Sequence, residues 1–303
     1  MGQSNYFSYK VIMRRAVIVL FICLALTFGL FFYIRLFSDN NFKIIFFNVG
    51  QGDSALIQFG DGQKMLVDCG PDRKVLTKLG KYLPFYDRTI DYLLISHPDS
   101  DHYGGCIDVV KRYNVKNIIE NGVVKNSDPF WVIWSEKIKN EKAAIKNIVG
   151  HEVINIASTT LEFFSPDGNL NLLEKNKEGN NLSVVFKLVR GNTSVLFVGD
   201  AEVPLEQALI QKYCLFPDGE SGSRLAVGTT PCSNLHAGYL KIGHHGSDSS
   251  SGDDWLGAIN PNVAIISVGK NTFGHPSLRI LKHLERSRIE AWRTDEKDDI
   301  IIQ

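Results

Sequence analysis

The stretch "LLISHPDSDHYGG", from Leu93 to Gly105, decides how this chain is interpreted. Its central segment, His97 to His102, holds two histidines and two aspartates in six positions, between an apolar run and a glycine pair. Imidazole nitrogens and carboxylate oxygens are ligands of zinc, manganese and iron. A solvated polar loop is the alternative interpretation. The HxDxDH spacing, with Pro98 restricting the backbone, favours a site for two metal ions.

Three later stretches supply further ligand-type side chains. "LFVGDAE" presents Asp200 after a predicted strand, "YLKIGHHGS" presents His244 and His245 after another, and "TFGHPS" presents His275 in a turn. One such residue alone is commonly a helix cap or a turn residue. Several strand ends that each deliver a ligand type predict a shared site at one edge of a sheet.

Composition limits the class of protein. The 303 residues carry 33 Lys+Arg and 33 Asp+Glu, so the chain lacks the basic excess of a bulk nucleic-acid-binding protein. A hydrophobic content of 44% is typical of a folded globular protein. Three basic side chains near the motifs, Lys241, Lys270 and Arg279, are candidates to line a local nucleic-acid groove, although scattered basic residues are usually solvated surface.

The pattern of apolar residues alternates between strand and helix, which predicts a layered α/β sandwich. Strands are expected at residues 43–49, 54–59, 64–69, 91–96, 152–156 and 160–164 and in "LSVVFKLV", "TSVLFVG", "YLKIG" and "NVAIISV". Helices are expected at residues 73–83, 107–113, 128–148 and 204–213, and a last helix and strand close the chain. "GDGQ" is expected to be a hairpin turn and residues 166–181 a surface loop.

The N-terminal region differs from the rest. Residues 16–34 carry no charge and are long enough to span a bilayer, which predicts a transmembrane anchor over residues 16–36 after a short tail of residues 1–15. The basic residues Lys10, Arg14 and Arg15 favour a cytoplasmic N-terminus and an extracytoplasmic catalytic domain. A cleaved signal peptide is the competing interpretation, and the length of the apolar run disfavours it.

The expected bonding state of the cysteines depends on the cellular compartment. In an exported domain Cys214 and Cys232 are candidates for a disulfide, whereas in a reducing compartment both are free thiols. Cys69 and Cys106 are predicted to be small packing residues.

Seven stretches together resemble a known family. They are, in order, "NVGQGDSALI", "LVDCGP", "LLISHPDSDHYGG", "NNLSVVFKL", "LFVGDAE", "KIGHHGS" and "FGHPS". This set resembles the metallo-β-lactamase fold and, within it, the hydrolase domain of ComEC-type DNA-uptake proteins. The resemblance implies a metallo-β-lactamase-like four-layer αββα sandwich over residues 42–303, preceded by one transmembrane helix.

The resemblance also implies two divalent metal ions, zinc or manganese. The implied ligands are His97 and Asp99 for the first ion, Asp101, His102 and His244 for the second, and Asp200 as the bridge. Asp99 stands where many relatives carry histidine, so the first site is richer in oxygen. Oxygen ligands shift the preference toward manganese, and zinc stays an option.

Further roles follow from the resemblance. A hydroxide bound to the metals is the implied nucleophile, and the implied catalytic residues are Asp101, His245 and His275. Contacts to the substrate phosphate are expected from Ser247, His275 and Asn181. Asp68 and Asp53 are expected to accept hydrogen bonds from ligating histidines, which usually need an acceptor for the second ring nitrogen.

These features give a first hypothesis and two alternatives. The first is a membrane-anchored, metal-dependent phosphodiesterase that acts on DNA outside the cytoplasmic membrane, with partner proteins of a DNA-uptake system. The second is hydrolysis of another ester, a thioester or a lactam on the same metals. The third is a catalytically idle metal-binding scaffold domain.

Overall fold

This computed structural model describes residues 13–29, 41–123, 125, 128–139, 142–168, 179–214 and 232–303. The chain divides into two units, Met1–Asn40 and Asn41–Gln303. In the first unit, residues 13–29 form a helix. Within the described residues, no helix is both long and apolar enough to cross a membrane. The span predicted over residues 16–36 is therefore not confirmed, and its last residues lie outside the described part.

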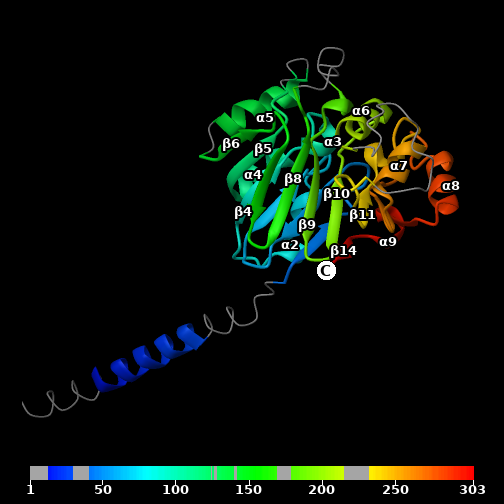
Figure 1. Ribbon diagram of the computed structural model, residues 1–303. Helices are drawn as coiled ribbons and strands as arrows, with labels where there is room; N and C mark the ends of the chain where they lie inside the picture. Colours follow the sequence, from blue (N-terminus) through cyan, green and yellow to red (C-terminus); the bar gives the residue numbers. More distant parts are fainter. Residues whose placement is uncertain are drawn as a thin grey trace, which may run out of the picture. The chain divides into compact units, whose positions relative to one another are not determined.

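The second unit contains two seven-stranded sheets (Figure 1). The first sheet has the order β14-β1-β2-β3-β4-β5-β6, with β1 (Lys43–Phe46), β2 (Ala55–Gln58), β3 (Lys64–Val67), β4 (Thr89–Leu94), β5 (Asn114–Glu120), β6 (Ala144–Asn147) and β14 (Ile300–Ile302). The second has the order β13-β12-β11-β10-β9-β8-β7, with β7 (Glu152–Ile156), β8 (Thr159–Ser165), β9 (Val185–Arg190), β10 (Thr193–Phe197), β11 (Tyr239–Lys241), β12 (Val263–Ile266) and β13 (Glu290–Arg293).

Helices cover the outer face of each sheet. The first sheet packs against α2 (Lys74–Tyr82), α4 (Cys106–Arg112) and α5 (Pro129–Lys139). The second packs against α6 (Val203–Tyr213), α7 (Asp253–Ile259) and α8 (Leu278–Arg286). The described residues also include four short helical segments: α3 (Ser100–Tyr103), α9 (Thr294–Lys297), η1 (Asn180–Leu182) and η2 (Gly243–Gly246).

The alternation of side chains along the strands creates these layers. In β1, Ile44 faces the core between the two sheets, whereas Ile45 faces the helices. In β10, Phe197 faces the core between the sheets and Leu196 faces the outer helices. Successive strand residues point to opposite faces, so a strand that is apolar throughout is buried on both sides. The predicted four-layer αββα arrangement is therefore observed.

Parallel pairing brings the motif loops to one edge. In the first sheet β3, β4 and β5 run parallel, and in the second β10, β11 and β12 do. The carboxyl ends of parallel strands meet at the same edge of a sheet, where ligand sites commonly form. The segments that follow β3, β4, β10, β11 and β12 carry the polar motifs.

One element prediction is wrong. Residues 128–148 do not form one helix, because α5 ends at Lys139 and β6 begins at Ala144. β6 pairs in parallel with β5. Neither of these two strands was predicted. All four β6 residues are exposed, so the segment lacks the alternation that identifies a half-buried strand, and pairing with β5 determines its conformation. The "GDGQ" turn is confirmed by the antiparallel pairing of β2 with β3.

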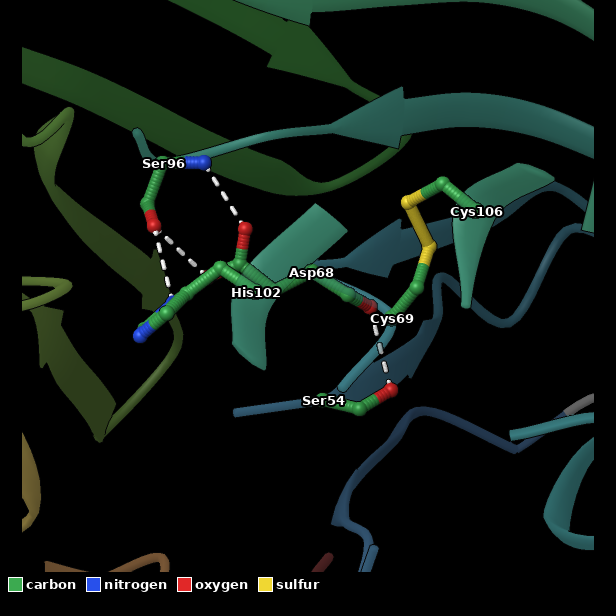
Figure 2. Close-up of a disulfide and its surroundings, with 6 residues drawn as sticks. All are labelled: Ser54, Asp68, Cys69, Ser96, His102 and Cys106. Carbon is green, nitrogen blue, oxygen red and sulfur yellow. Dashed lines mark hydrogen bonds and ion pairs between the residues drawn. A yellow bond between two sulfur atoms is a disulfide. The ribbon is translucent and has the colours of Figure 1, made fainter. Parts of the chain in front are cut away.

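Two disulfides are present, Cys69–Cys106 and Cys214–Cys232. The Cys214–Cys232 bond agrees with the alternative expected for an exported domain and not with free thiols. The prediction for Cys69 and Cys106 is wrong, because these residues are covalently joined rather than merely packed. Their bond links the segment after β3 to the start of α4 (Figure 2).

Candidate metal centre

Asp68 anchors the edge of the first sheet. It follows β3 with a positive φ of 54°. Its Oδ1 accepts a hydrogen bond from the Ser96 backbone N–H at 2.8 Å, and its Oδ2 accepts from Ser96 Oγ at 2.7 Å. Asp68 Oδ2 also lies 2.9 Å from His102 Nδ1, which donates to it (Figure 2). Asp68 thus fixes the orientation of the His102 ring, the role that the sequence predicted for it.

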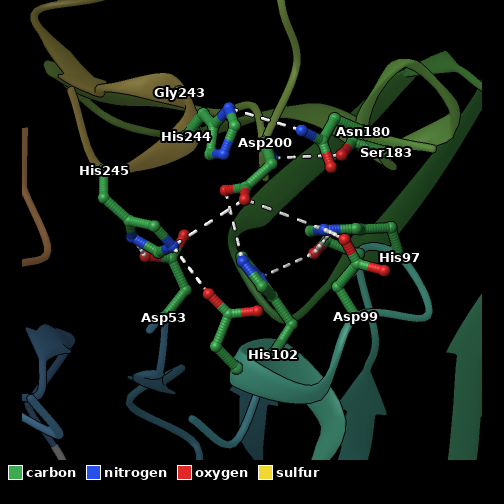
Figure 3. Close-up of polar contacts among 12 residues, drawn as sticks. Asp53, His97, Asp99, His102, Asn180, Ser183, Asp200, Gly243, His244 and His245 are labelled. Atoms are coloured by element: carbon green, nitrogen blue, oxygen red, sulfur yellow. Dashed lines mark hydrogen bonds and ion pairs between the residues drawn. The ribbon is translucent and has the colours of Figure 1, made fainter. Parts of the chain in front are cut away.

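Three histidines direct the same ring nitrogen at Asp200. Their Nε2 atoms lie 3.8 Å (His97), 3.2 Å (His102) and 3.7 Å (His245) from the nearer carboxylate oxygen of Asp200. Figure 3 shows the rings of His97, His102 and His245 around this carboxylate. His97 and His102 come from the first sheet, whereas Asp200 and His245 come from the second. Three strand ends, those of β4, β10 and β11, therefore converge on one point.

The Nδ1 atoms of these rings are held by other acceptors. His97 Nδ1 lies 3.0 Å from Ser96 Oγ, and His245 Nδ1 lies 2.9 Å from the Ser267 carbonyl oxygen. A ring whose Nδ1–H donates to such an acceptor presents an Nε2 lone pair to a metal ion. The three buried rings therefore share the arrangement that metal ligation needs.

Several buried atoms of this cluster lack a hydrogen-bond partner among the residues that the structure describes. They include Nε2 of His97, Nε2 of His102 and Oδ1 of Asp200. Buried polar atoms are normally satisfied, so an unsatisfied group needs an explanation such as an ion. Asp101, His102, Asp200 and His245 each offer one ligand atom, and these atoms all lie within 4.8 Å of one another. The donor set fits a divalent cation.

The charges in the cluster also favour a bound cation. Burial alone lowers the pKa of His245, but Asp200, Asp101 and Asp53 outweigh it and raise that pKa to about 10. Burial also lowers the pKa of His102, yet its contacts with Asp200 and Asp68 raise it well above the usual range. Carboxylates thus dominate the cluster and draw positive charge to the rings. A metal ion supplies such charge in place of the ring protons.

A second group of acidic residues and histidine is a poorer metal site. Asp53, Asp68 and His102 also bring ligand atoms close together. However, Asp68 already accepts from Ser96 and His102, and Asp53 Oδ2 lies 2.7 Å from the buried Lys241 ammonium. Both carboxylates thus already contact protein donors, although Asp53 Oδ1 has no hydrogen-bond partner among the described residues. The group around Asp200 is therefore the better candidate.

Lys241 and Asp53 form a buried ion pair behind His245. Lys241 is only 3% exposed, and Asp53 Oδ1 lies 3.3 Å from His245 Nδ1. Burial alone raises the pKa of Asp53, but Lys241 and His245 outweigh it and hold that pKa below its usual range. The suggestion that Lys241 lines a nucleic-acid groove is wrong, because its ammonium is enclosed. Asp53 lies beside a histidine of the cluster, but His245 Nδ1 bonds the Ser267 carbonyl oxygen, so the support expected from Asp53 stays a prediction.

Asp99 occupies the more open side of the cluster. Its Oδ2 lies 3.5 Å from His97 Nε2, and its Oδ1 lies 2.6 Å from Lys125 Nζ. Burial alone raises the pKa of Asp99, but His97 and Lys125 outweigh it and lower that pKa. Lys125 was not among the predicted site residues. It stands 26 positions away from Asp99 in a segment with no recognisable motif, and only the fold brings the two together.

The prediction that His244 is a ligand is not supported, because His244 does not join the cluster and His245 occupies the place expected for it. His244 Nδ1 lies 3.1 Å from Glu202 Oε1, and its ring centroid is 6.3 Å from that of His245. Both histidines have positive φ values, 47° and 52°, and so their side chains point in different directions. His245 Nε2 instead lies 3.1 Å from Asp101 Oδ2. The sequence alone offered no means of choosing between the two rings.

Asn181 is placed differently from the prediction. Its Oδ1 accepts from the backbone N–H groups of Glu202 and Leu205, so the side chain holds the start of α6 instead of facing substrate. The neighbouring Asn180 lies beside the candidate site, with Nδ2 3.3 Å from His244 Nδ1 (Figure 3). The asparagine that lies next to His244 is thus one residue earlier in the sequence.

Ser247 and Arg279 hold the loop after β11. Ser247 Oγ lies 3.0 Å from Ser249 Oγ, and Ser249 Oγ donates to Glu202 Oε1 at 2.8 Å. Arg279 donates to the carbonyl oxygens of Asp248 and Ser250, so its guanidinium stabilises the loop. These contacts form a polar network around His244, next to the cluster.

His275 lies beside His244, with ring centroids 5.5 Å apart. Its Nδ1 is buried without a partner among the described residues. Burial, with the neighbouring His244 and His245, lowers the pKa of His275. His275 is therefore close to the cluster without contacting Asp200.

Close backbone packing brings the motif loops together. A Cβ atom on Gly105 would lie 2.3 Å from the Cys69 carbonyl oxygen, and one on Gly52 would lie 2.4 Å from the Asp101 carbonyl oxygen. Gly52 also has a φ of 138°. Glycine at these two positions allows "VGQGD" and the glycine pair after His102 to pack against neighbouring motifs.

This chain is similar to several known proteins. Residues 47–270 match the family described as the Metallo-beta-lactamase superfamily. ComE operon protein 3 of Bacillus subtilis is 28% identical over 298 residues, which cover 92% of this chain and 35% of that protein. Competence protein ComA of Neisseria gonorrhoeae is 27% identical over 209 residues, 69% of this chain and 24% of that protein. Recombination protein 2 of Haemophilus influenzae is 27% identical and covers 82% of this chain.

Solved structures share the fold. The metallo-beta-lactamase fold protein YhfI from Bacillus subtilis has a TM-score of 0.52 at 12% identity, covering 86% of this chain and 99% of its own. CmlA, a diiron beta-hydroxylase from Streptomyces venezuelae, has a TM-score of 0.52 at 13% identity, covering 86% of this chain and 54% of its own. The chain spans a quarter to a third of the length of the curated relatives named above.

Proposed function

The chain belongs to the metallo-β-lactamase superfamily, and on this premise we propose that it is a two-metal hydrolase that cleaves phosphodiester bonds in DNA. The observation that carries the proposal is the convergence of three histidine Nε2 atoms on the Asp200 carboxylate. The proposed ligands are His97 and Asp99 on one side, Asp101, His102 and His245 on the other, and Asp200 between them.

Two divalent ions at such a site, zinc or manganese, supply an activated water near neutral pH and stabilise charge on the attacked group. The chain itself orients the ligands. Asp68 holds His102 through Nδ1, and the Ser267 carbonyl oxygen holds His245 through Nδ1. Fixing each ring in this way keeps its Nε2 directed at the shared carboxylate.

We assign proton transfer to His244. Glu202 Oε1 lies 3.1 Å from His244 Nδ1 and accepts a hydrogen bond from its N–H, which leaves Nε2 to exchange a proton with the departing oxygen of the substrate. His244 is partly exposed beside the metal cluster, so a substrate can reach it. Ser247 and His275, which flank this ring, are proposed to contact the phosphate.

The relatives support the choice of substrate. Their names refer to competence and recombination, processes in which DNA is taken up and rearranged. The charge pattern does not select a substrate, since Lys270 alone of the three suggested basic side chains is exposed without an ion-pair partner among the described residues. DNA is therefore proposed on the strength of the family.

Activity on three substrates tests the proposal. The full chain, loaded with manganese or zinc and analysed for metal content, is incubated with single-stranded DNA, bis-p-nitrophenyl phosphate and nitrocefin. We expect cleavage of the first two, loss of cleavage in Asp101→Ala, and no change in Asp254→Ala, an exposed aspartate of α7. Cleavage of nitrocefin alone would indicate a lactamase, and metal binding without any turnover would indicate a scaffold.

The location outside the cytoplasmic membrane is a separate proposal. Two disulfides favour an oxidising compartment, since cytosolic proteins rarely keep them. Anchoring by residues 16–36 rests on the uncharged run of residues 16–34 alone. Carbonate extraction of membranes, followed by protease treatment of intact cells, tests both. A protein that is washed off by carbonate is not anchored, and one that resists protease until lysis lies inside.

A further inference from the structure

A rigid loop after β12 presents an exposed aromatic ring beside the candidate centre. The Asn271 side chain ties this loop together. Its Oδ1 accepts from the backbone N–H groups of Phe273, Gly274 and His275 at 3.0, 3.0 and 3.1 Å. Its Nδ2 donates to the carbonyl oxygens of Gly269 and His275 at 2.9 and 2.8 Å. The backbone that carries Phe273 is therefore fixed before any ligand arrives.

Phe273 contributes nothing to the hydrophobic core. Its side chain is 71% exposed, and it belongs to none of the three core clusters of the described residues. A single exposed apolar side chain is ordinary on a protein surface. Phe273 differs because its loop is held by five hydrogen bonds from one side chain and adjoins the candidate site.

Aromatic rings connect Phe273 to the metal cluster. Its ring centroid lies 5.8 Å from that of His275 at an interplanar angle of 33°. The His275 ring lies 5.5 Å from His244, and His244 lies 6.3 Å from His245. His245 in turn contacts Asp101 and Asp200. The rings form a path from the cluster to the exposed face of Phe273.

We infer that Phe273 is a stacking platform for an unpaired nucleobase next to the bond that is cleaved. This inference rests on the proposed phosphodiesterase function and assigns single-stranded nucleic acid as its substrate class. A flat, exposed ring on a fixed loop suits a base, because every base has a π-face and stacks on an aromatic side chain without a sequence requirement.

The charges near the loop fit the same substrate. Lys270, in the same loop, is exposed and has no ion-pair partner among the described residues. A free ammonium attracts the phosphate groups of a nucleic-acid strand. Bases in a duplex are already stacked on one another, so the platform selects single strands.

Cleavage kinetics of the full chain test the inference. The substrates are an oligodeoxythymidine and an oligomer of the same length in which every nucleotide is abasic. Phe273→Ala is expected to lower kcat/KM for the oligodeoxythymidine about tenfold or more, with the abasic oligomer unaffected. Phe273→Trp is expected to retain the wild-type preference. Phe85→Ala is the matched control, since Phe85 is 83% exposed and precedes β4, at the opposite end of that strand from His97.

Two results would overturn the inference. One is an equal loss for both oligomers in Phe273→Ala, and the other is no loss for either. Binding of the same two oligomers, labelled for fluorescence anisotropy, distinguishes failure of this inference from failure of the proposed function. If neither oligomer is cleaved but Phe273→Ala still weakens binding of the base-bearing oligomer alone, the platform stands and the phosphodiesterase assignment fails.

Discussion

The two sides of the candidate metal centre are held in different ways. We call Asp101, His102 and His245 the braced half, because its two rings are fixed through Nδ1 by Asp68 and by the Ser267 carbonyl oxygen. We call His97 and Asp99 the open half. Within the described part of the chain, the His97 ring is fixed by Ser96 Oγ alone, and the Asp99 side chain is 32% exposed and paired with Lys125.

This difference predicts two metal ions of unequal affinity. Acceptors that orient ligating histidines strengthen metal binding, and the braced half has a buried carboxylate or carbonyl oxygen behind each ring. The open half has fewer nitrogen ligands and a cation, Lys125, already on its carboxylate. We therefore expect the braced half to fill first in a metal titration.

The largest expected effect comes from Asp200, which the two halves share. Asp200→Asn keeps the shape of the side chain and removes its charge. Loss of both ions is expected to cost several kcal/mol of transition-state stabilisation, or about 1,000-fold in cleavage rate. Mass spectrometry for metal content and an oligonucleotide assay check this. A variant that retains two ions per chain would contradict the shared role of Asp200.

Lys241 tests the support behind the braced half. Lys241→Met leaves Asp53 buried without its cation, which is expected to lower the free energy of unfolding by about 3–5 kcal/mol. Urea denaturation of the metal-free protein measures this. The double variant Lys241→Met/Asp53→Asn is expected to recover most of the loss, because no uncompensated charge stays buried. Failure of the double variant to recover would assign the loss to packing.

Asp68→Asn tests the acceptor behind His102. An asparagine still accepts from the Ser96 backbone, but its amide group faces His102 Nδ1 as a second donor. The affinity of the braced half is expected to fall about 10–100-fold, with a smaller change in the open half. Isothermal titration with zinc resolves the two steps, and Asp61→Asn in the β2–β3 turn is the control. Equal weakening of both steps would mean that the halves are not independent.

Lys125 gives the smallest expected effect and acts on the open half. Lys125→Met removes a cation that competes for Asp99, so the weaker metal is expected to bind up to about fivefold more tightly, as for a partly exposed ion pair. Lys125→Arg keeps the charge and should behave as wild type. Weaker binding in Lys125→Met would instead show that Lys125 positions Asp99.

The sequence predicted the sandwich and most of the cluster for identifiable reasons. Apolar runs that are buried on both faces identified β1 to β3. His97, Asp99, Asp101 and His102 lie within one short stretch of sequence, so their pattern is visible without the fold. β6 was not predicted, because an exposed edge strand takes its conformation from its neighbour.

The rest of the site depends on backbone details and distant contacts. Two adjacent histidines are equivalent in the sequence, and the left-handed conformations at His244 and His245 decide which ring faces Asp200. Lys125 and Glu202 carry no local signal, since each acts on a residue at least 26 positions away. Such partners are apparent only once the chain is folded.

The Cys69–Cys106 bond fastens the residue after Asp68 to the helix that follows His102. Protein produced in a reducing host cytoplasm would therefore lack this disulfide and is expected to contain less than its full complement of zinc. A batch secreted through an oxidising export route, or refolded with a glutathione couple, should load fully. If preparations differ in specific activity, we expect the cause to be the oxidation state of these two cysteines and not the choice of metal salt.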